Sequence, residues 1–162
     1  MAETLSVDQM LPNRFEPKRK HRWILAIDGI DSFLVKGTAR PQVDINPTEI
    51  HWINTKRYVA GKATFSTMSI TLYDPIAPSG AQQVMEWVRA HYESVSGRAG
   101  YADFYKRDIV LKMLDPVGTV IEWWDIKGAQ ITSAQFNDLA YDGDEAVEIA
   151  LTIQMDNAIL QY

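Results

Sequence analysis

The stretch 147-VEIALTIQMD-156 alternates strictly between two kinds of side chain. The odd-numbered positions, from Val147 to Met155, are all apolar, and the even-numbered positions carry mostly hydroxyl, amide or carboxylate groups. Successive side chains of a β-strand point to opposite faces, so this pattern predicts a strand with one buried face and one partly acidic face. Such a strand needs a second layer to cover its apolar side.

Further strands are predicted where shorter runs show the same alternation. These runs are residues 23–27, a returning run near Phe33 and Val35 that completes a hairpin, and residues 64–73, 109–113 and 119–126. Pro41 and Pro47 restrict the run 42–53 to an edge strand or an irregular segment. The polar and basic residues 54–62 are expected to form an exposed loop.

One helix is predicted over residues 81–95, because apolar side chains recur there at steps of three and four. Ser79 is its candidate N-cap and Gly97 its candidate stop signal. Many strands with one helix predict an α+β, mainly β protein, in which two antiparallel sheets pack together and the helix covers a flank. We expect a single domain, residues 22–162, after an extended N-terminal arm, residues 1–21.

Charge is distributed unevenly along the chain. Residues 1–114 carry 15 Lys and Arg against 12 Asp and Glu, whereas residues 115–162 carry one Lys against nine acids. This asymmetry is either ordinary surface charge or a sign of head-to-tail attraction between identical subunits.

The residues give little indication of chemistry. The chain has no Cys, and its three His are scattered, so no catalytic residues, no metal site and no cofactor are expected. The acidic run from Asp142 to Glu145 does not fit a calcium loop, because the sixth and twelfth positions would be Val147 and Ile153. No apolar segment is long enough for a membrane helix, and we expect a protein that is not an enzyme and is not exported.

A basic cluster in the arm suggests one alternative function. Its cations are Arg14, Lys18, Arg19 and Lys20, followed by Arg22, with Phe15 and Trp23 nearby. Basic arms with aromatic neighbours can follow a phosphate backbone, so a nucleic-acid-binding β-barrel module is one possible interpretation. A solvated basic arm on an acidic protein is the simpler one.

The segment 54-NTKRYVAGKATF-65 resembles the signature stretch of the tail tube proteins of contractile-tailed bacteriophages. In that family an Asn, a basic residue, Ala-Gly and Thr-Phe precede a strand. Further matches follow in the same order: Lys36, Thr38, Ala39 and Pro41; Trp87; Tyr105, Lys106 and Arg107; Ile126, Lys127 and Gly128; and Asp142 with the final strand. The resemblance extends from about Arg22 to Met155.

The resemblance implies a barrel-like sandwich that assembles into hexameric rings with a continuous β-barrel lumen. Such rings stack into the inner tube of a contractile tail, whose partners are the sheath, baseplate and tail-terminator proteins, and DNA passes through the lumen. The expected location is the virion tail, assembled in the host cytoplasm. A tube-initiating baseplate paralogue, or the inner tube of a phage-derived contractile bacteriocin or injection system, is the alternative.

Three sets of candidate site residues follow. The inter-ring contact candidates are Asn54, Lys56, Arg57 and Lys62, facing Asp142, Asp144 and Glu145. The lumen-lining candidates are Ser69, Thr71, Glu148, Thr152, Gln154 and Asp156, because carboxylates in a conduit repel phosphates. The candidates for contacts of the N-terminal arm are Arg14, Lys18, Arg19 and Lys20.

Overall fold

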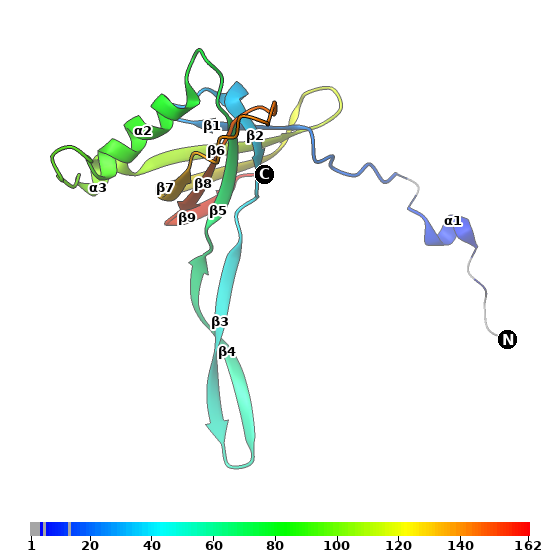
Figure 1. Ribbon diagram of the computed structural model, residues 1–162. Coiled ribbons are helices and arrows are strands. Elements are labelled where there is room, and N and C mark those ends of the chain that lie inside the picture. Colours follow the sequence, from blue (N-terminus) through cyan, green and yellow to red (C-terminus); the bar gives the residue numbers. More distant parts are fainter. Residues whose placement is uncertain (1–3, 5, 13) are drawn as a thin grey trace.

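The computed structural model describes residues 4, 6–12 and 14–162, which form a β-rich body, a long protruding hairpin and an N-terminal arm (Figure 1). The elements in chain order are α1 (Val7–Met10), β1 (Trp23–Ile27), β2 (Val35–Thr38), β3 (Val43–Trp52), β4 (Thr55–Phe65), β5 (Met68–Tyr73), α2 (Gly80–His91), α3 (Ala102–Tyr105), β6 (Arg107–Leu114), β7 (Val120–Gln135), β8 (Glu148–Gln154) and β9 (Asn157–Leu160). A 3-10 turn, Ser32–Leu34, lies between β1 and β2.

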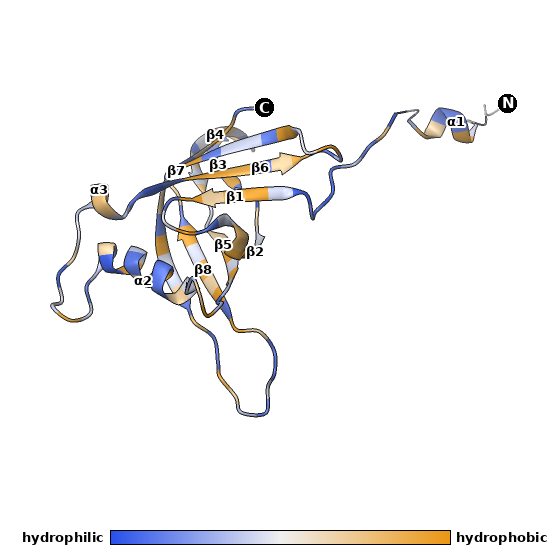
Figure 2. Cartoon of the chain, turned by 90° about the horizontal axis from the view of Figure 1, so that it is seen from above, coloured by the Kyte–Doolittle hydropathy of each residue, from blue (hydrophilic) through white to orange (hydrophobic). Residues whose placement is uncertain are grey.

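Strand β7 is shared by two antiparallel sheets. Its first part pairs with β6 and β9, and its last part pairs with β8. The first sheet therefore has the order β1-β6-β7-β9 and the second has the order β7-β8-β5-β2. Seen from above, β1 and β6 cross β5 and β8 at a steep angle (Figure 2). The predicted arrangement of two sheets is confirmed, with one long strand linking them.

The passage of β7 between the sheets is marked by Gly128, whose φ is 65°. The pairing with β6 shifts register between Arg107 and Ile109, and the pairing with β8 shifts between Ile131 and Ser133. Glycine adopts positive φ without the steric cost that a Cβ imposes. A Cβ at position 128 would also overlap the carboxylate of Asp156.

The core lies between the two sheets and beneath α2. It contains Leu25, Ile27, Ile109, Leu111 and Ile126 from the first sheet, Met68, Ile70, Leu72, Ile149, Leu151 and Ile153 from the second, and Val84 and Trp87 from α2. The alternating apolar positions of β5 and β8 are thus buried, as predicted. Trp87 is fully buried, and its Nε1 donates to the carbonyl oxygen of Tyr105 at 2.7 Å, so its polar atom is satisfied.

Helix α2 begins as predicted but ends earlier. The Ser79 hydroxyl accepts a hydrogen bond from the Gln82 backbone N–H, which confirms the N-cap. The expected helix to Val95 is wrong, because the helix ends at His91 and Val95 lies exposed in the following turn, where there is no core surface to cover. Gly97 lies in that turn and not at the helix end. Within the described ranges, no helix is long and apolar enough to cross a membrane.

The hairpin predicted between the first two strands is wrong. β1 pairs with β6, and β2 pairs with β5 in the other sheet. The chain crosses between the sheets through the 3-10 turn, whose Leu34 is buried. Alternation identifies the two strands but carries no information about their partners, so a short connection was mistaken for a hairpin turn.

The exposed loop predicted over residues 54–62 is also wrong in kind. Those residues form most of β4, which pairs with β3 in a hairpin that projects from the body (Figure 1). The turn at its tip is Ile53–Asn54. Within the described residues β3 pairs with β4 and with no other strand, in agreement with the edge position predicted from Pro47. The register of this pair shifts between Ile45 and Pro47.

Several strand boundaries differ from the predicted ones. The run 64–73 is divided between β4 and β5, β7 continues nine residues beyond the predicted end at Ile126, and β9 was not predicted. A tight turn follows β6, in which the Gly118 N–H donates to the Asp115 carbonyl oxygen at 3.1 Å.

The arm is connected to the body through Glu122, a carboxylate that is only 4 % exposed. Lys18 of the arm forms an ion pair with it, and Arg40, which follows β2, approaches it at 3.5 Å. The Trp124 indole N–H donates to the same carboxylate. Burial would raise the pKa of Glu122, but the hydrogen bonds from Lys18 and Trp124 and the nearby charges of Lys18 and Arg40 outweigh it, so that pKa lies below its ordinary value.

We predict that Gly128→Ala lowers the free energy of unfolding by about 1–2 kcal/mol, because alanine at positive φ is strained. Urea denaturation measures this change. Gly37→Ala is the matched control, since a Cβ at position 37 would meet no atom within 4 Å. Equal midpoints for the two variants would contradict the role of Gly128 in the passage between sheets.

We predict that Glu122→Gln lowers the free energy of unfolding by about 1–2 kcal/mol at about pH 7, because the ion pairs are lost. A carboxyl whose pKa is depressed in the folded state contributes stability above its unfolded pKa of about 4.3 and loses it as the pH falls through the folded value. The wild type and the variant should therefore converge as the pH falls to about 3. Urea titrations at both pH values measure this, with the exposed Glu86→Gln as control. If the difference in the free energy of unfolding between the wild type and the variant stays constant with pH, the prediction is contradicted.

Candidate assembly surfaces

His91, at the end of α2, is held by two backbone groups. His91 accepts a hydrogen bond at Nε2 from the Ile131 backbone N–H at 3.2 Å, and its Nδ1 lies 2.9 Å from the Trp87 carbonyl oxygen. These partners require a neutral ring with the proton on Nδ1. The ring stacks on Tyr105 at 4.4 Å. His91 is therefore a structural residue, and the described part of the chain contains no group of three or more potential metal ligands.

The outward face of the second sheet is polar. Ser69 and Thr71 of β5 lie beside Glu148, Thr152 and Gln154 of β8, all on the face opposite the core. Asp156 does not belong to this face. It lies beyond the end of β8, and its carboxylate is 2.7 Å from Lys106 Nζ. Five of the six lumen-lining candidates are therefore brought together.

One polar residue of this face also anchors the hairpin. The side-chain amide of Gln154 donates to the carbonyl oxygen of Phe65 at 2.8 Å, where β4 joins the body. Glu148 forms an ion pair with Lys36 of β2, and this hydrogen bond raises the pKa of Lys36 above its ordinary value.

The second sheet has two open edges. Among the residues that the structure describes, β2 pairs only with β5. At the other edge, the β6 pairing of β7 stops at Ala129, so Gln130–Gln135 have β8 on one side and no strand on the other. Open edges are sites at which further strands can add.

The hairpin carries all four basic-side candidates for inter-ring contacts. Lys56 already has a partner on the hairpin, because its Nζ lies 3.1 Å from Glu49 Oε2. Arg57 and Lys62 are exposed and form no ion pair within the described residues, and Asn54 lies in the tip turn. The four candidates are thus exposed on the same hairpin, in strand β4 and its tip turn, and not in the long loop that was predicted.

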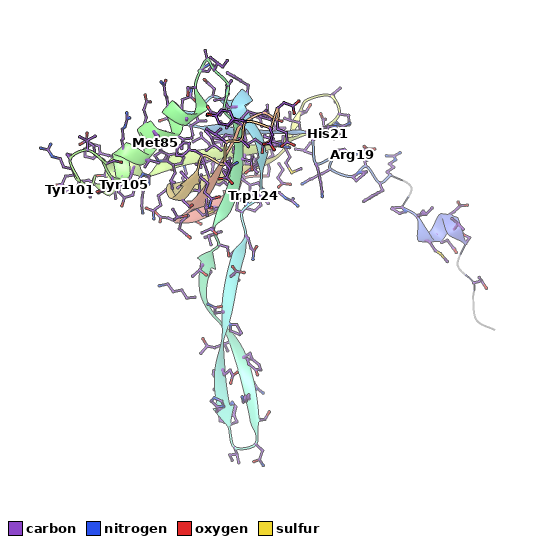
Figure 3. All side chains as sticks on the ribbon, viewed as in Figure 1. Arg19, His21, Met85, Tyr101, Tyr105 and Trp124 are labelled. Carbon is purple, nitrogen blue, oxygen red and sulfur yellow. The ribbon has the colours of Figure 1, made fainter. Side chains whose placement is uncertain are left out.

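Apolar side chains, which the sequence analysis did not identify, are the more prominent feature of the hairpin. Exposed members are Val43, Ile45, Ile50, Trp52, Ile53, Tyr58 and Val59. Trp52 is 62 % exposed and Ile53 is fully exposed at the tip. Side chains project from the hairpin with nothing packed on them (Figure 3). The sequence 50-IHWI-53 was the available signal, but residues 42–53 were interpreted only as an edge strand or an irregular segment.

The acidic candidates lie in the connection between β7 and β8, residues 137–147. Asp142, Asp144 and Glu145 are all exposed. This connection, orange in Figure 1, lies on the upper part of the body, whereas the hairpin tip forms the lower end of the molecule. Within one chain the acidic candidates therefore do not meet Arg57 or Lys62.

The arm cations differ from one another. Lys18 is bound to Glu122, whereas Arg14, Arg19 and Lys20 are exposed, and the part of the arm that the structure describes shows no ion pair for them. The arm leads away from the body (Figure 3). Glu122, which receives Lys18, was not identified from the sequence, because an acid in a predicted strand gives no sign of burial.

No protein-family model matches the sequence, and no curated protein matches it. Solved structures with the same fold do exist. A chain of an extracellular contractile injection system, the PVC sheath-tube complex in the extended state, is 14 % identical with a TM-score of 0.71, and the match covers 98 % of this chain and 99 % of that chain. A chain of the anti-feeding prophage baseplate, 6-fold symmetrised, is 10 % identical with a TM-score of 0.69, covering 91 % and 97 %.

The SPP1 tail tube gives a weaker match, with 14 % identity and a TM-score of 0.54 over 89 % of this chain and 78 % of that chain. Identities this low establish a shared fold. The fold expected from the resemblance to tail tube proteins is thereby confirmed, and the chain has the fold found in contractile injection systems and in the SPP1 tail tube.

Proposed function

We propose that this chain is the structural subunit of a tube, in which copies join side by side into hexameric rings and the rings stack within a contractile tail or injection system. The observation that carries this proposal is the pair of open edges on the second sheet. The shared fold with a sheath-tube complex supports it. We assign no catalytic role to the chain.

Strand direction favours joining through these edges. Neighbours in the order β7-β8-β5-β2 are all antiparallel, so β2 runs opposite to β7. When copies are placed side by side in the same orientation, β2 of one copy therefore meets β7 of the next in antiparallel fashion. A closed ring of copies satisfies every such edge and produces one continuous barrel.

The polar face of the second sheet then lines the lumen. Ser69, Thr71, Glu148, Thr152 and Gln154 would face water there, which fits their partial exposure in the single chain. A wall of hydroxyl, amide and carboxylate groups lets a polyanion pass without binding, and DNA is the cargo we propose for a phage tail.

The hairpin is proposed as the contact between stacked rings. It projects beyond the body, and its apolar tip would be buried against the next ring. Arg57 and Lys62, which are exposed on the same hairpin, would add polar contacts with that ring. The arm cations Arg14, Arg19 and Lys20 would contact a neighbouring subunit as well.

The proposed partners follow from this placement. They are further copies of the chain, a sheath around the tube, and baseplate and terminator proteins at its ends, within a virion tail assembled in the host cytoplasm. An inner tube of an extracellular injection system is the second candidate, because the match to such a complex covers nearly all of both chains. A tube-initiating baseplate paralogue is the third, supported by the baseplate match.

We predict that the purified wild-type protein forms hollow rings and tubes in negative-stain micrographs, and that Trp52→Ser combined with Ile53→Ser retains rings but loses tubes. The reason is that the apolar tip contributes to stacking and not to lateral pairing. Val95→Ser combined with Ile76→Ser is the matched control, since both residues are exposed away from the hairpin.

Two results would count against these proposals in different ways. A wild-type protein that stays a single chain at high concentration would contradict the tube function itself. Tubes of normal length from the tip variant would contradict only the role of the hairpin.

A further inference from the structure

An open cationic groove lies between β1 and β2, the strands at the two ends of the continuous sheet order. Its volume is about 630 Å³. The cations along it are Lys18, Lys20, Lys36 and Arg40, and its apolar wall is formed by Trp23 and Leu111. The groove lies apart from the hairpin, and it meets the proposed lumen face at Lys36, which pairs with Glu148.

The groove retains positive charge after its internal ion pairs are counted. Lys18 and Arg40 share Glu122, and Lys36 pairs with Glu148, so two carboxylates face four cations. Lys20 forms no ion pair with any residue in the described ranges. An acidic ligand would therefore be attracted here.

The β7–β8 connection has the complementary composition. Residues 137–147 carry four acids and no Lys or Arg, and none of these acids forms an ion pair within the described chain. The connection also presents Leu139 and Tyr141, which are both strongly exposed. Acidic and apolar groups thus stand on one segment, and cationic and apolar groups line one groove.

We propose that this acidic connection of one copy docks into the cationic groove of the next copy in the ring. The inference rests on the proposed side-by-side pairing of β2 with β7. In this antiparallel pairing Gln135, the last residue of β7, lies toward the start of β2, where Lys36 lines the groove, and the connection begins two residues later. In its own chain the connection borders a second hollow, which shares Lys36 with the groove and is also lined by Glu148.

The test uses two charge-reversed proteins and their mixture. The groove variant is Lys20→Glu with Arg40→Gln, which still allows a hydrogen bond to Glu122, and the connection variant is Asp142→Lys with Asp144→Lys. In about 0.1 M salt, where screening acts beyond about 10 Å, each variant alone should form rings only at protein concentrations at least about tenfold higher than the wild type. Sedimentation velocity measures this, and circular dichroism shows that each variant is folded.

Mixing the two variants in equal amounts should restore rings. Each junction then joins either a native groove to a native connection or the charge-reversed groove to the charge-reversed connection, and both junctions are attractive. Arg98→Glu and Asp103→Lys, on the exposed segment around α3, are the control reversals and should assemble as the wild type does.

Cross-linking provides a readout independent of charge. The chain has no native cysteine, so Lys20→Cys and Asp142→Cys can be introduced singly. A mixture of the two single variants should give a disulfide-linked dimer on oxidation, and a protein carrying both should give a ladder of linked copies. An internal bond within one chain would overturn the proposal.

The remaining outcomes distinguish a failure of the docking proposal from a failure of the proposed tube function. If the wild type forms rings and the reversed variants do so equally well, the docking proposal is wrong and the tube function stands. If the variants fail singly and the mixture does not recover, the connection and groove do not meet, and the docking proposal is again wrong. If the wild type forms no rings, both the docking proposal and the proposed tube function are contradicted.

Discussion

The structure depends on one constraint, that a single strand belongs to both sheets. β7 has partners on both sides in the first sheet, and it leaves β6 behind as it enters the second. Beyond Ala129 the backbone N–H groups on that side have no strand partner, and a buried unsatisfied N–H costs about 1–3 kcal/mol. The His91 ring accepts the one at Ile131. The position of α2 is therefore set by two requirements together, covering the core with Trp87 and satisfying the backbone of β7.

This arrangement leaves the second sheet with borders that the chain does not complete. His91 accepts the hydrogen bond of the first unpaired amide of β7, and among residues 4, 6–12 and 14–162 no strand pairs with the rest of that border or with the outer side of β2. Isolated β proteins usually protect such borders with charges, prolines or bulges. Here β2 carries Lys36 and a register shift beside Gly37, which discourage uncontrolled pairing, while the antiparallel alternation of strands remains suited to one specific neighbour. The same features thus limit aggregation and favour ring closure.

The sequence predicted strands well and their partners poorly, for a physical reason. Alternation at Met68, Ile70 and Leu72 reports which face is buried, because that is a local property of the pleat. Strand pairing is decided by residues that are distant in the sequence, so the hairpin between β1 and β2 was predicted in error. The extension of β7 through Gly128 was missed for another reason, because glycine usually signals the end of a strand. The same distinction separates the site residues that were predicted from those that were missed. Five polar residues of one face were identified from their period, whereas buried Glu122 and the exposed apolar hairpin depend on where the folded chain places them.

The hairpin has no hydrophobic core of its own within the single chain. A two-stranded ribbon has no core of its own and is marginally stable in water at best. β3 and β4 nevertheless extend from the body with apolar side chains exposed on residues such as Trp52 and Tyr58. At the base, the Phe65 carbonyl oxygen accepts a hydrogen bond from Gln154. Burying one large apolar side chain stabilises by about 1.5–3 kcal/mol, so a neighbour covering a few of these residues would offset the cost of ordering the ribbon. A neighbour in contact with the hairpin would therefore add to the stability of the ribbon.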